Sequence, residues 1–171
     1  MGGGHAIRHP TKTEAALTTL QRPRTIRQLS RTLDMSLDAS MRLLARLRRR
    51  GVVHCLNPQA RRSRVYVRAG AQLPRDVDWV LYGWVSYSQR RAVLEALDVP
   101  RYPAAIKRRA RYLHPGIRLS ANNVRDIIRL FRERGIVTPL DVSGRAHPSY
   151  ALTPHGAVLQ RLILESEAAR P

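Results

Sequence analysis

The chain has 171 residues and carries 31 Lys and Arg against 12 Asp and Glu, so its net charge is +19. That excess favours a polyanionic partner, nucleic acid first and an anionic membrane surface second, and 43% hydrophobic residues exclude wholesale disorder. The single cysteine excludes an internal disulfide or a site with several thiolate ligands, and no apolar run is long enough to cross a bilayer. The length suits one ordinary domain or two small ones of about 70–80 residues.

The basic residues are almost all arginine, because Lys12 and Lys107 are the only lysines. A guanidinium group offers a planar fork of donors that fits phosphate and the edge of guanine. GC-rich codon usage explains the ratio of arginine to lysine equally well, but it does not explain the net charge. Residues 1–11 lack the apolar segment of a signal peptide, and we expect them to form a flexible arm. We therefore expect a soluble protein of the cytoplasm, associated with the nucleoid if it binds DNA.

Residues 12–70 have the pattern of a first small domain. Apolar residues at helical spacing and the breaks between them predict three helices, at residues 13–20, 25–33 and 36–50. Ser36 is placed to cap the third helix, and Gly51 is placed to end it. Two β-rich runs, residues 52–56 and 64–68, flank the loop sequence NPQARRS and predict a hairpin.

Residues 71–87 are rich in aromatic side chains and are predicted to link the first domain to a second. Aromatic rings can stack on bases, but we expect this group to pack between the domains: Trp79, Tyr82, Trp84 and Tyr87. Such packing would make the linker stiff and would fix the spacing of the two third helices.

Residues 88–171 repeat the plan of the first domain and add a final helix. The predicted elements are helices at residues 88–97, 103–113 and 120–135, a hairpin of residues 136–142 and 150–152, and a helix from residue 153. The two copies align where LRRRGVV at residues 47–53 meets FRERGIV at residues 131–137, and the second copy has about seven extra residues, at YLHPGIRL. The final helix, residues 154–168, could pack on its own domain or mediate homodimerisation.

In each domain the third helix is predicted to bury one apolar stripe. The first stripe is Ala39 or Ser40 with Leu43, Leu44 and Leu47, and the second is Val124, Ile127, Ile128 and Phe131. Polar and basic residues then occupy the other side of each helix.

The repeated order of helix, helix, turn, helix and hairpin predicts a mainly α fold with small β-hairpin wings (α+β), built as two tandem winged helix-turn-helix domains. The segment GVVHCLNPQARRSRVYVRA resembles the end of the third helix and the wing of archaeal winged-helix transcription regulators. SANNVRDIIRLFRERGIV is similar to their recognition helix, and SYALTPHGAVL to their passage from wing to final helix. The first domain departs from the pattern after its wing, with VYVRAGAQL, and the second departs in its long YLHPGIRL turn. The resemblance implies binding to double-stranded DNA and regulation of transcription.

In a helix-turn-helix the third helix enters the major groove with its N-terminal residues near the base edges. Arginine fits guanine and asparagine fits adenine, so base readout is expected from Asn122, Asn123 and Arg125. The basic wings are expected to reach phosphates or the minor groove. The full set of expected DNA-binding residues is Ser36, Arg42, Arg46, Arg49, Arg61, Arg62, Arg64, Asn122, Asn123, Arg125, Arg129 and Arg145.

Other interpretations of the basic residues stay open. A polar helix face is often merely solvated, and residues 48–50 would also offset the dipole at the end of their helix. The protein could instead be a sequence-tolerant chromatin or architectural DNA-binding protein, an RNA-binding component of a ribonucleoprotein, or a protein-interaction module that uses charge for steering. We expect no enzymatic activity, cofactor or metal, because the histidines are scattered and no glycine-rich phosphate loop is present.

Overall fold

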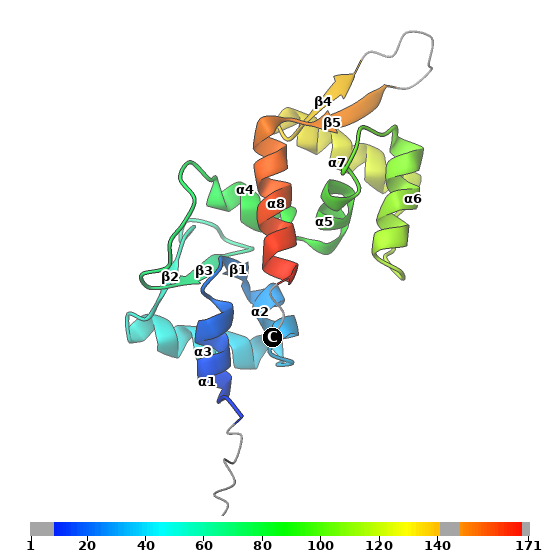
Figure 1. Ribbon diagram of the computed structural model, residues 1–171. Helices are drawn as coiled ribbons and strands as arrows, with labels where there is room; N and C mark the ends of the chain where they lie inside the picture. The colour runs from blue at the N-terminus through cyan, green and yellow to red at the C-terminus, as the bar shows by residue number, and fades with distance from the viewer. Residues whose placement is uncertain (1–8, 141–147, 169–171) are drawn as a thin grey trace, which may run out of the picture. The chain divides into compact units, whose positions relative to one another are not determined.

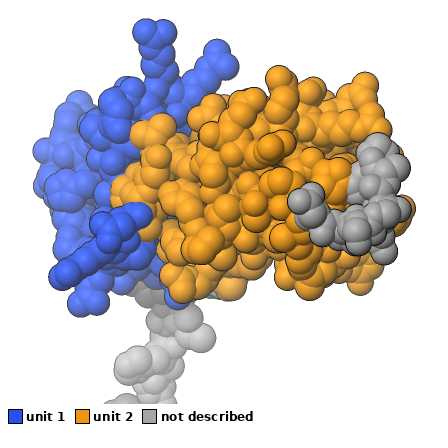
Figure 2. All heavy atoms as spheres, turned by 90° about the horizontal axis from the view of Figure 1, so that it is seen from above, with its two compact units in different colours: residues 1–76, 169–171 blue, residues 77–168 orange. Residues whose placement is uncertain are grey.

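The computed structural model describes residues 9–140 and 148–168, and the fold within these ranges is α+β (Figure 1). Eight helices and two small antiparallel sheets make up the regular structure of the described residues, which confirms the predicted class of helices with small β elements. The chain divides into two compact units, which Figure 2 colours separately. We name them unit 1, with described residues 9–76, and unit 2, with described residues 77–140 and 148–168.

The described part of unit 1 contains three helices and a three-stranded sheet. The helices are α1 (Lys12–Thr19), α2 (Ile26–Thr32) and α3 (Leu37–Arg49), and the strands are β1 (Arg24–Thr25), β2 (Val53–Cys55) and β3 (Val65–Arg68). Strand β3 lies in the middle and pairs antiparallel with both β1 and β2. Each helix begins at a hydroxyl side chain that accepts a hydrogen bond from the first turn: Thr11, Thr25 and Ser36. Gly51, with a φ of 69°, follows α3 in the left-handed region.

The amphipathic pattern of α3 builds the core of unit 1. Its buried side chains are Ser40, Leu43, Leu44 and Leu47, which confirms the predicted stripe. They pack with buried residues of α1, α2 and the sheet, among them Ala16, Leu20, Leu29, Leu33, Val53 and Tyr66. Burial of one leucine side chain contributes about 1.5–3 kcal/mol. The leucines therefore fix α3 on the core and leave its other side to arginine.

Strand β1 brings an arginine into this core. Pro23 predicts a break in the chain, but the two residues after it pair with β3. Arg24 is 1% exposed, and its Nε donates a 3.1 Å hydrogen bond to the carbonyl of Thr19. A two-residue strand has no periodicity to recognise, so the sequence does not predict it.

Unit 2 begins with a helix where the sequence predicts a linker. The segment Trp79–Val85 forms α4, whose N-cap Asp78 accepts a hydrogen bond from the amide of Leu81. Leu81 and Tyr82 are buried. The boundary between the units therefore divides the segment of residues 71–87, because its residues from 77 onward belong to unit 2.

Unit 2 continues with three helices, a hairpin and a final helix. These elements are α5 (Ser88–Glu95), α6 (Pro103–Leu113), α7 (Ala121–Glu133), β4 (Val137–Leu140), β5 (Ser149–Leu152) and α8 (Pro154–Ala168). Strands β4 and β5 pair antiparallel, with Val137 opposite Leu152. Helix α7 buries the four predicted side chains: Val124, Ile127, Ile128 and Phe131.

Helix α8 packs on its own unit. Leu159 and Ile163 are fully buried, and the side-chain amide of Gln160 donates a 2.8 Å hydrogen bond to the carbonyl of Leu94 in α5. Leu164 stays exposed, at 48%. The buried apolar positions of α8 are thus occupied within the chain rather than left for a second copy.

Gly156 lies where α8 passes the residue that precedes β4, and a Cβ atom there would be 2.1 Å from the carbonyl oxygen of Ile136. That oxygen already accepts a 3.0 Å hydrogen bond from the amide of Thr153, so it cannot move freely. We expect Gly156→Ala to lower the free energy of unfolding by about 1–3 kcal/mol, measured by urea denaturation. His155→Ala, an exposed change in the same turn, should stay within about 0.5 kcal/mol of the wild type. Equal stability of the two variants would contradict this packing.

Candidate nucleic-acid interface

The outer side of α3 carries three arginines at helical spacing. Arg42, Arg46 and Arg49, which we name the α3 stripe, are exposed on the side away from the buried leucines. In the part of the chain that the structure describes, none of the three forms an ion pair. The stripe is therefore a row of positive charge without a carboxylate partner among the described residues. At the start of the same helix, the hydroxyl of Ser36 accepts a 3.2 Å hydrogen bond from the amide of Ala39, so Ser36 acts as the cap of α3.

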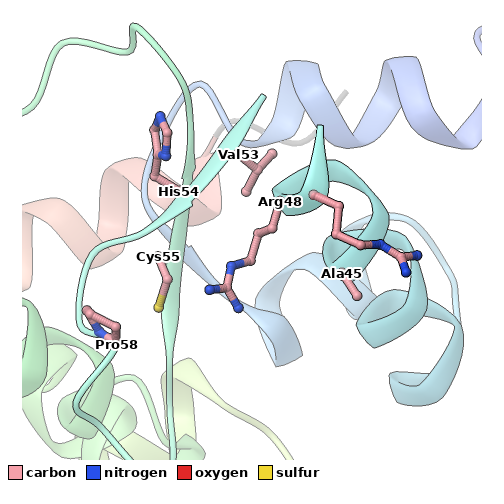
Figure 3. Close-up of a pocket in the computed structure, with 7 residues that line it drawn as sticks. Ala45, Arg48, Val53, His54, Cys55 and Pro58 are labelled. Atoms are coloured by element: carbon pink, nitrogen blue, oxygen red, sulfur yellow. The ribbon is translucent and has the colours of Figure 1, made fainter. Parts of the chain in front are cut away.

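A groove runs beside the α3 stripe, between the C-terminal half of α3 and the start of the hairpin (Figure 3). Its volume is about 690 Å³, and its lining residues are Ala45, Arg48, Arg49, Val53, His54, Cys55 and Pro58. Figure 3 shows the side chain of Arg48 reaching from the helix toward the strand that carries Cys55. Because Arg49 belongs to both the stripe and the groove, these two cationic features are continuous.

Tyr66 connects α3 to the hairpin electrostatically. It is 8% exposed on β3, and burial raises the pKa of its phenol above the ordinary value, with a further rise from Cys55. The guanidinium groups of Arg64 and Arg48 act in the opposite direction, because they favour the phenolate. Arg48 comes from α3 and Arg64 from the hairpin, so both elements bring positive charge to the same hydroxyl. The cationic surface of unit 1 therefore extends from α3 onto the hairpin.

Asn57 closes the loop between β2 and β3. The residue is fully buried, and its Oδ1 accepts a 2.7 Å hydrogen bond from the amide of Val65. Its Nδ2 donates a 3.2 Å hydrogen bond to the carbonyl of Ser63, a residue with a φ of 57°. The sequence predicts this segment as a hairpin loop, and Asn followed by Pro is a turn signal with a known mechanism, the bonding of the Asn side chain to nearby backbone.

The three arginines of this loop differ in their surroundings. Arg61 and Arg62 are exposed, and neither forms an ion pair with any carboxylate in the described ranges. The Nε of Arg64 donates a 3.1 Å hydrogen bond to the carbonyl of Ala60 across the loop. Arg64 thus has a defined position, and the other two add charge beside it.

Helix α7 of unit 2 carries a second and less cationic set of candidate side chains. Asn122, Arg125 and Arg129 are exposed. The Nη1 of Arg125 donates a 3.4 Å hydrogen bond to Asn122, and the Nη2 of Arg129 lies 3.5 Å from the carboxylate of Asp126. Exposed contacts of this kind contribute little to stability, but the carboxylate of Asp126 lowers the positive charge of this face.

Asn123 has a structural role that the sequence analysis missed. Its Oδ1 accepts hydrogen bonds from the amide and the hydroxyl of Ser120, at 3.1 and 2.6 Å. The hydroxyl of Ser120 accepts a 3.0 Å hydrogen bond from the amide of Asn123 in return, which completes a capping box. A bidentate contact to adenine needs the same oxygen as an acceptor. Asn123 could therefore read a base only by giving up the cap.

The expected DNA-binding residues fall into two groups. Unit 1 carries Ser36, Arg42, Arg46, Arg49, Arg61, Arg62 and Arg64, and unit 2 carries Asn122, Asn123, Arg125 and Arg129. Arg145 lies outside the described residues. Within unit 1, Arg48 connects the end of α3 with the hairpin, because it lines the groove between them and acts electrostatically on Tyr66. Arg48 is not among the predicted DNA-binding residues.

Helix α6 adds a cationic surface to unit 2. The sequence-based prediction covered only the buried positions of this helix. Ile106 and Ala110 are buried as predicted. The exposed or half-buried side carries Lys107, Arg108, Arg111 and Tyr112, and Tyr112 is 74% exposed. The run KRRAR, which contains no acidic residue, is the sequence signal that could have indicated this surface.

Comparison of the chain with protein-family models, with curated proteins and with solved structures found no match. None of the described helices is both long and apolar enough to span a membrane. A search of residues 9–140 and 148–168 for three His, Cys, Asp or Glu side chains that could share a metal ion found no such group. The interpretation of the site therefore depends on its own geometry and charge.

Asn57→Ala should loosen the hairpin loop, because it leaves the fully buried amide of Val65 without its acceptor. We expect the free energy of unfolding to fall by about 1–3 kcal/mol, measured by chemical denaturation. Asn57→Asp keeps an acceptor at this position and should lose less. A wild-type unfolding curve for Asn57→Ala would show that the loop does not depend on these bonds.

Asn122 and Asn123 offer a matched pair, since they are adjacent and only one of them caps α7. Asn123→Ala should lower the free energy of unfolding by about 1 kcal/mol through loss of the capping box. Asn122→Ala should stay within about 0.5 kcal/mol of the wild type. Thermal unfolding followed by circular dichroism measures both, and the reverse ranking would contradict the assignment of the cap.

Proposed function

We propose that the protein binds double-stranded DNA as a transcription regulator, with α3 and α7 as its recognition helices. In unit 1 the hairpin follows α1, α2 and α3, with the short strand β1 after α1, and in unit 2 it follows α5, α6 and α7, with α4 ahead of them. This order supports two tandem winged helix-turn-helix domains, a plan that places the third helix in the major groove. The observation that carries the proposal is the α3 stripe, which faces solvent without a carboxylate partner among the described residues while the other side of the helix is buried.

The distribution of charge supports a polyanionic partner. Residues 1–76 include 16 Lys and Arg and 4 Asp and Glu, whereas residues 77–168 include 14 and 8. Because the α3 stripe has no counter-ion among the described residues, a row of phosphates beside it lowers the electrostatic energy of unit 1. Release of the ions condensed on DNA adds a favourable contribution that weakens as salt rises. Unit 1 is therefore expected to supply most of the electrostatic affinity.

Each part of this surface fits a different part of the duplex. The major groove, about 12 Å wide, admits an α-helix, and a guanidinium group within it can donate to O6 and N7 of guanine. Arg48 in the groove and Arg64 on the hairpin are suited to the phosphates that border the major groove. In unit 2, Asn122 and Arg125 occupy the first turns of α7, the part of a recognition helix that meets base edges.

Replacing Arg42, Arg46 and Arg49 together by alanine should weaken duplex binding strongly. With about eight phosphate contacts the wild-type slope of log affinity against log salt should be near −7, and loss of three contacts should make it shallower by nearly 3. The matched control replaces the same three residues by lysine, which keeps the charge and should keep the slope while reducing any preference for guanine. Fluorescence anisotropy with a labelled duplex measures both. Wild-type affinity and slope in the alanine variant would overturn the proposal.

Competition with RNA separates DNA binding from RNA binding. The major groove of A-form RNA is deep and narrow and does not admit a helix. Duplex RNA should therefore compete poorly with duplex DNA of the same length, and equal competition would favour a ribonucleoprotein component.

Selection from a random duplex library separates a regulator from an architectural protein. A regulator enriches a motif, because base contacts discriminate by about 1–3 kcal/mol each. Recovery of unselected sequences would instead favour an architectural protein that binds the backbone alone.

A further inference from the structure

Two arginines of unit 2 stack on one tryptophan. The guanidinium carbon of Arg90 lies 4.2 Å from the centroid of the Trp84 ring, and that of Arg134 lies 4.3 Å from it. The same ring meets Phe131 edge-on, at 6.0 Å between centroids. Phe131 is fully buried, so the indole is anchored to the core of unit 2. We name Trp84, Arg90 and Arg134 the arginine–tryptophan cluster.

The cluster contains two positive charges without an acidic partner. Neither Arg90 nor Arg134 forms an ion pair within residues 9–140 and 148–168. Burial lowers the pKa of the Arg90 guanidinium below its ordinary value and the charge of Arg134 lowers it further, while Tyr87 acts in the opposite direction. Arginine nevertheless stays protonated at physiological pH. The two charges therefore persist and repel each other.

Arg91, the next residue in α5, is an arginine whose charge is compensated by carboxylates of the same unit. Arg91 is buried, and its guanidinium lies 3.4 Å from the carboxylate of Glu95 and 2.9 Å from that of Glu167. Within residues 9–140 and 148–168 the fold thus supplies two carboxylates to Arg91 and none to Arg90. Stacking on Trp84 compensates part of the charge of Arg90, but the second guanidinium on the same ring works against that gain.

The position of Arg90 strengthens the case for an external anion. It lies in the first turn of α5, where the positive end of the helix dipole disfavours a cation. Tyr87 gives this helix end no side-chain hydrogen bond, so the first N–H groups of α5 also favour an anion. Arg134, by contrast, is the C-cap of α7, where the dipole favours a cation. Among the described residues, the charge of Arg90 has neither a carboxylate partner nor a favourable helix dipole, and its contacts are the rings of Trp84 and Tyr87, the latter at 4.9 Å.

We propose that the arginine–tryptophan cluster binds phosphate groups of a nucleic-acid backbone, an inference that rests on the proposed DNA-binding function. A guanidinium group that stacks on an indole uses its face, and the N–H donors at its edge stay available for phosphate oxygens. Trp84 holds both side chains before binding, which reduces the conformational entropy lost on association. Helix α7 rises about 18 Å from Asn122 to Arg134. The cluster therefore contacts the backbone at the opposite end of α7 from the residues placed for base edges.

Trp84 can report this binding directly. The chain has two tryptophans, so Trp79→Phe leaves Trp84 as the only one. This variant of the full chain is titrated at low salt with a 20-base-pair duplex and, separately, with inorganic phosphate. We expect a saturable change of Trp84 fluorescence with the duplex, at the same midpoint as the anisotropy of a labelled duplex.

Adding Arg90→Ala and Arg134→Ala should abolish the fluorescence change, weaken duplex binding on the order of tenfold and make the salt slope shallower by nearly 2. The control replaces Arg118 and Arg161 by alanine, which removes the same charge from exposed positions of unit 2 and should preserve the fluorescence change and its midpoint. Arg90→Gln with Arg134→Gln keeps polar side chains of similar reach and gives the same readout if the alanine variant does not fold.

Wild-type affinity and fluorescence response in the folded double variant would overturn the inference. A response to inorganic phosphate but not to the duplex would also overturn it, because the cluster would then be a site for a small anion. Failure of the α3 stripe variant to weaken duplex binding counts against the proposed function instead, and it leaves the Trp84 titration with phosphate interpretable.

Discussion

Repulsion among 31 cationic side chains, opposed by 12 acidic ones, is the constraint on which the structure depends. Of the arginines that the structure describes, the two most deeply buried both have partners in the chain. Arg24 donates to the carbonyl of Thr19, and Arg91 lies between two carboxylates. A buried charge without such partners would cost several kcal/mol. Most other guanidinium groups lie near solvent, where water and salt screen them, and the apolar faces of the helices hold each unit together against the remaining repulsion.

Helices α3 and α7 each bury one side and expose the other, but their exposed sides differ in charge. Each helix begins at a serine cap and buries four residues on one side. On α3 every charged residue after the first turn is an arginine, whereas on α7 Asp126 lies beside Arg129 and Asn122 beside Arg125. Unit 1 therefore has the stronger positive field, which acts over about a Debye length and favours an anionic partner. Unit 2 has fewer unpaired charges near the start of α7 and more hydrogen-bonding side chains, which fits the base contacts proposed for it better than bulk attraction.

The helices and their buried stripes could be predicted because they depend on local spacing and caps. The leucines of α3 and the isoleucines of α7 recur with the helical period, and a serine precedes each run. Strand β1 and helix α4 could not be predicted in the same way: the first is two residues long, and the second is an aromatic run that is also compatible with a linker. Residue type alone predicts base readout for Asn123, but whether its side chain caps α7 or reaches a base depends on the rotamer of that one side chain. The arginine–tryptophan cluster joins residues 84, 90 and 134, and such a long-range contact leaves no trace in local spacing.

The choice of arginine over lysine matters because one guanidinium group can serve the fold and a ligand at once. It has five N–H donors and a flat face, whereas an ammonium group is a compact and strongly hydrated point charge. Arg64 uses Nε to hold the hairpin loop through Ala60 and still brings charge to the hydroxyl of Tyr66. The guanidinium groups of Arg90 and Arg134 place their faces on the Trp84 ring, which leaves the N–H donors at their edges available. A lysine at any of these positions would keep the charge but lose the positioning, so the surface owes its order to the shape of the guanidinium group as much as to its charge.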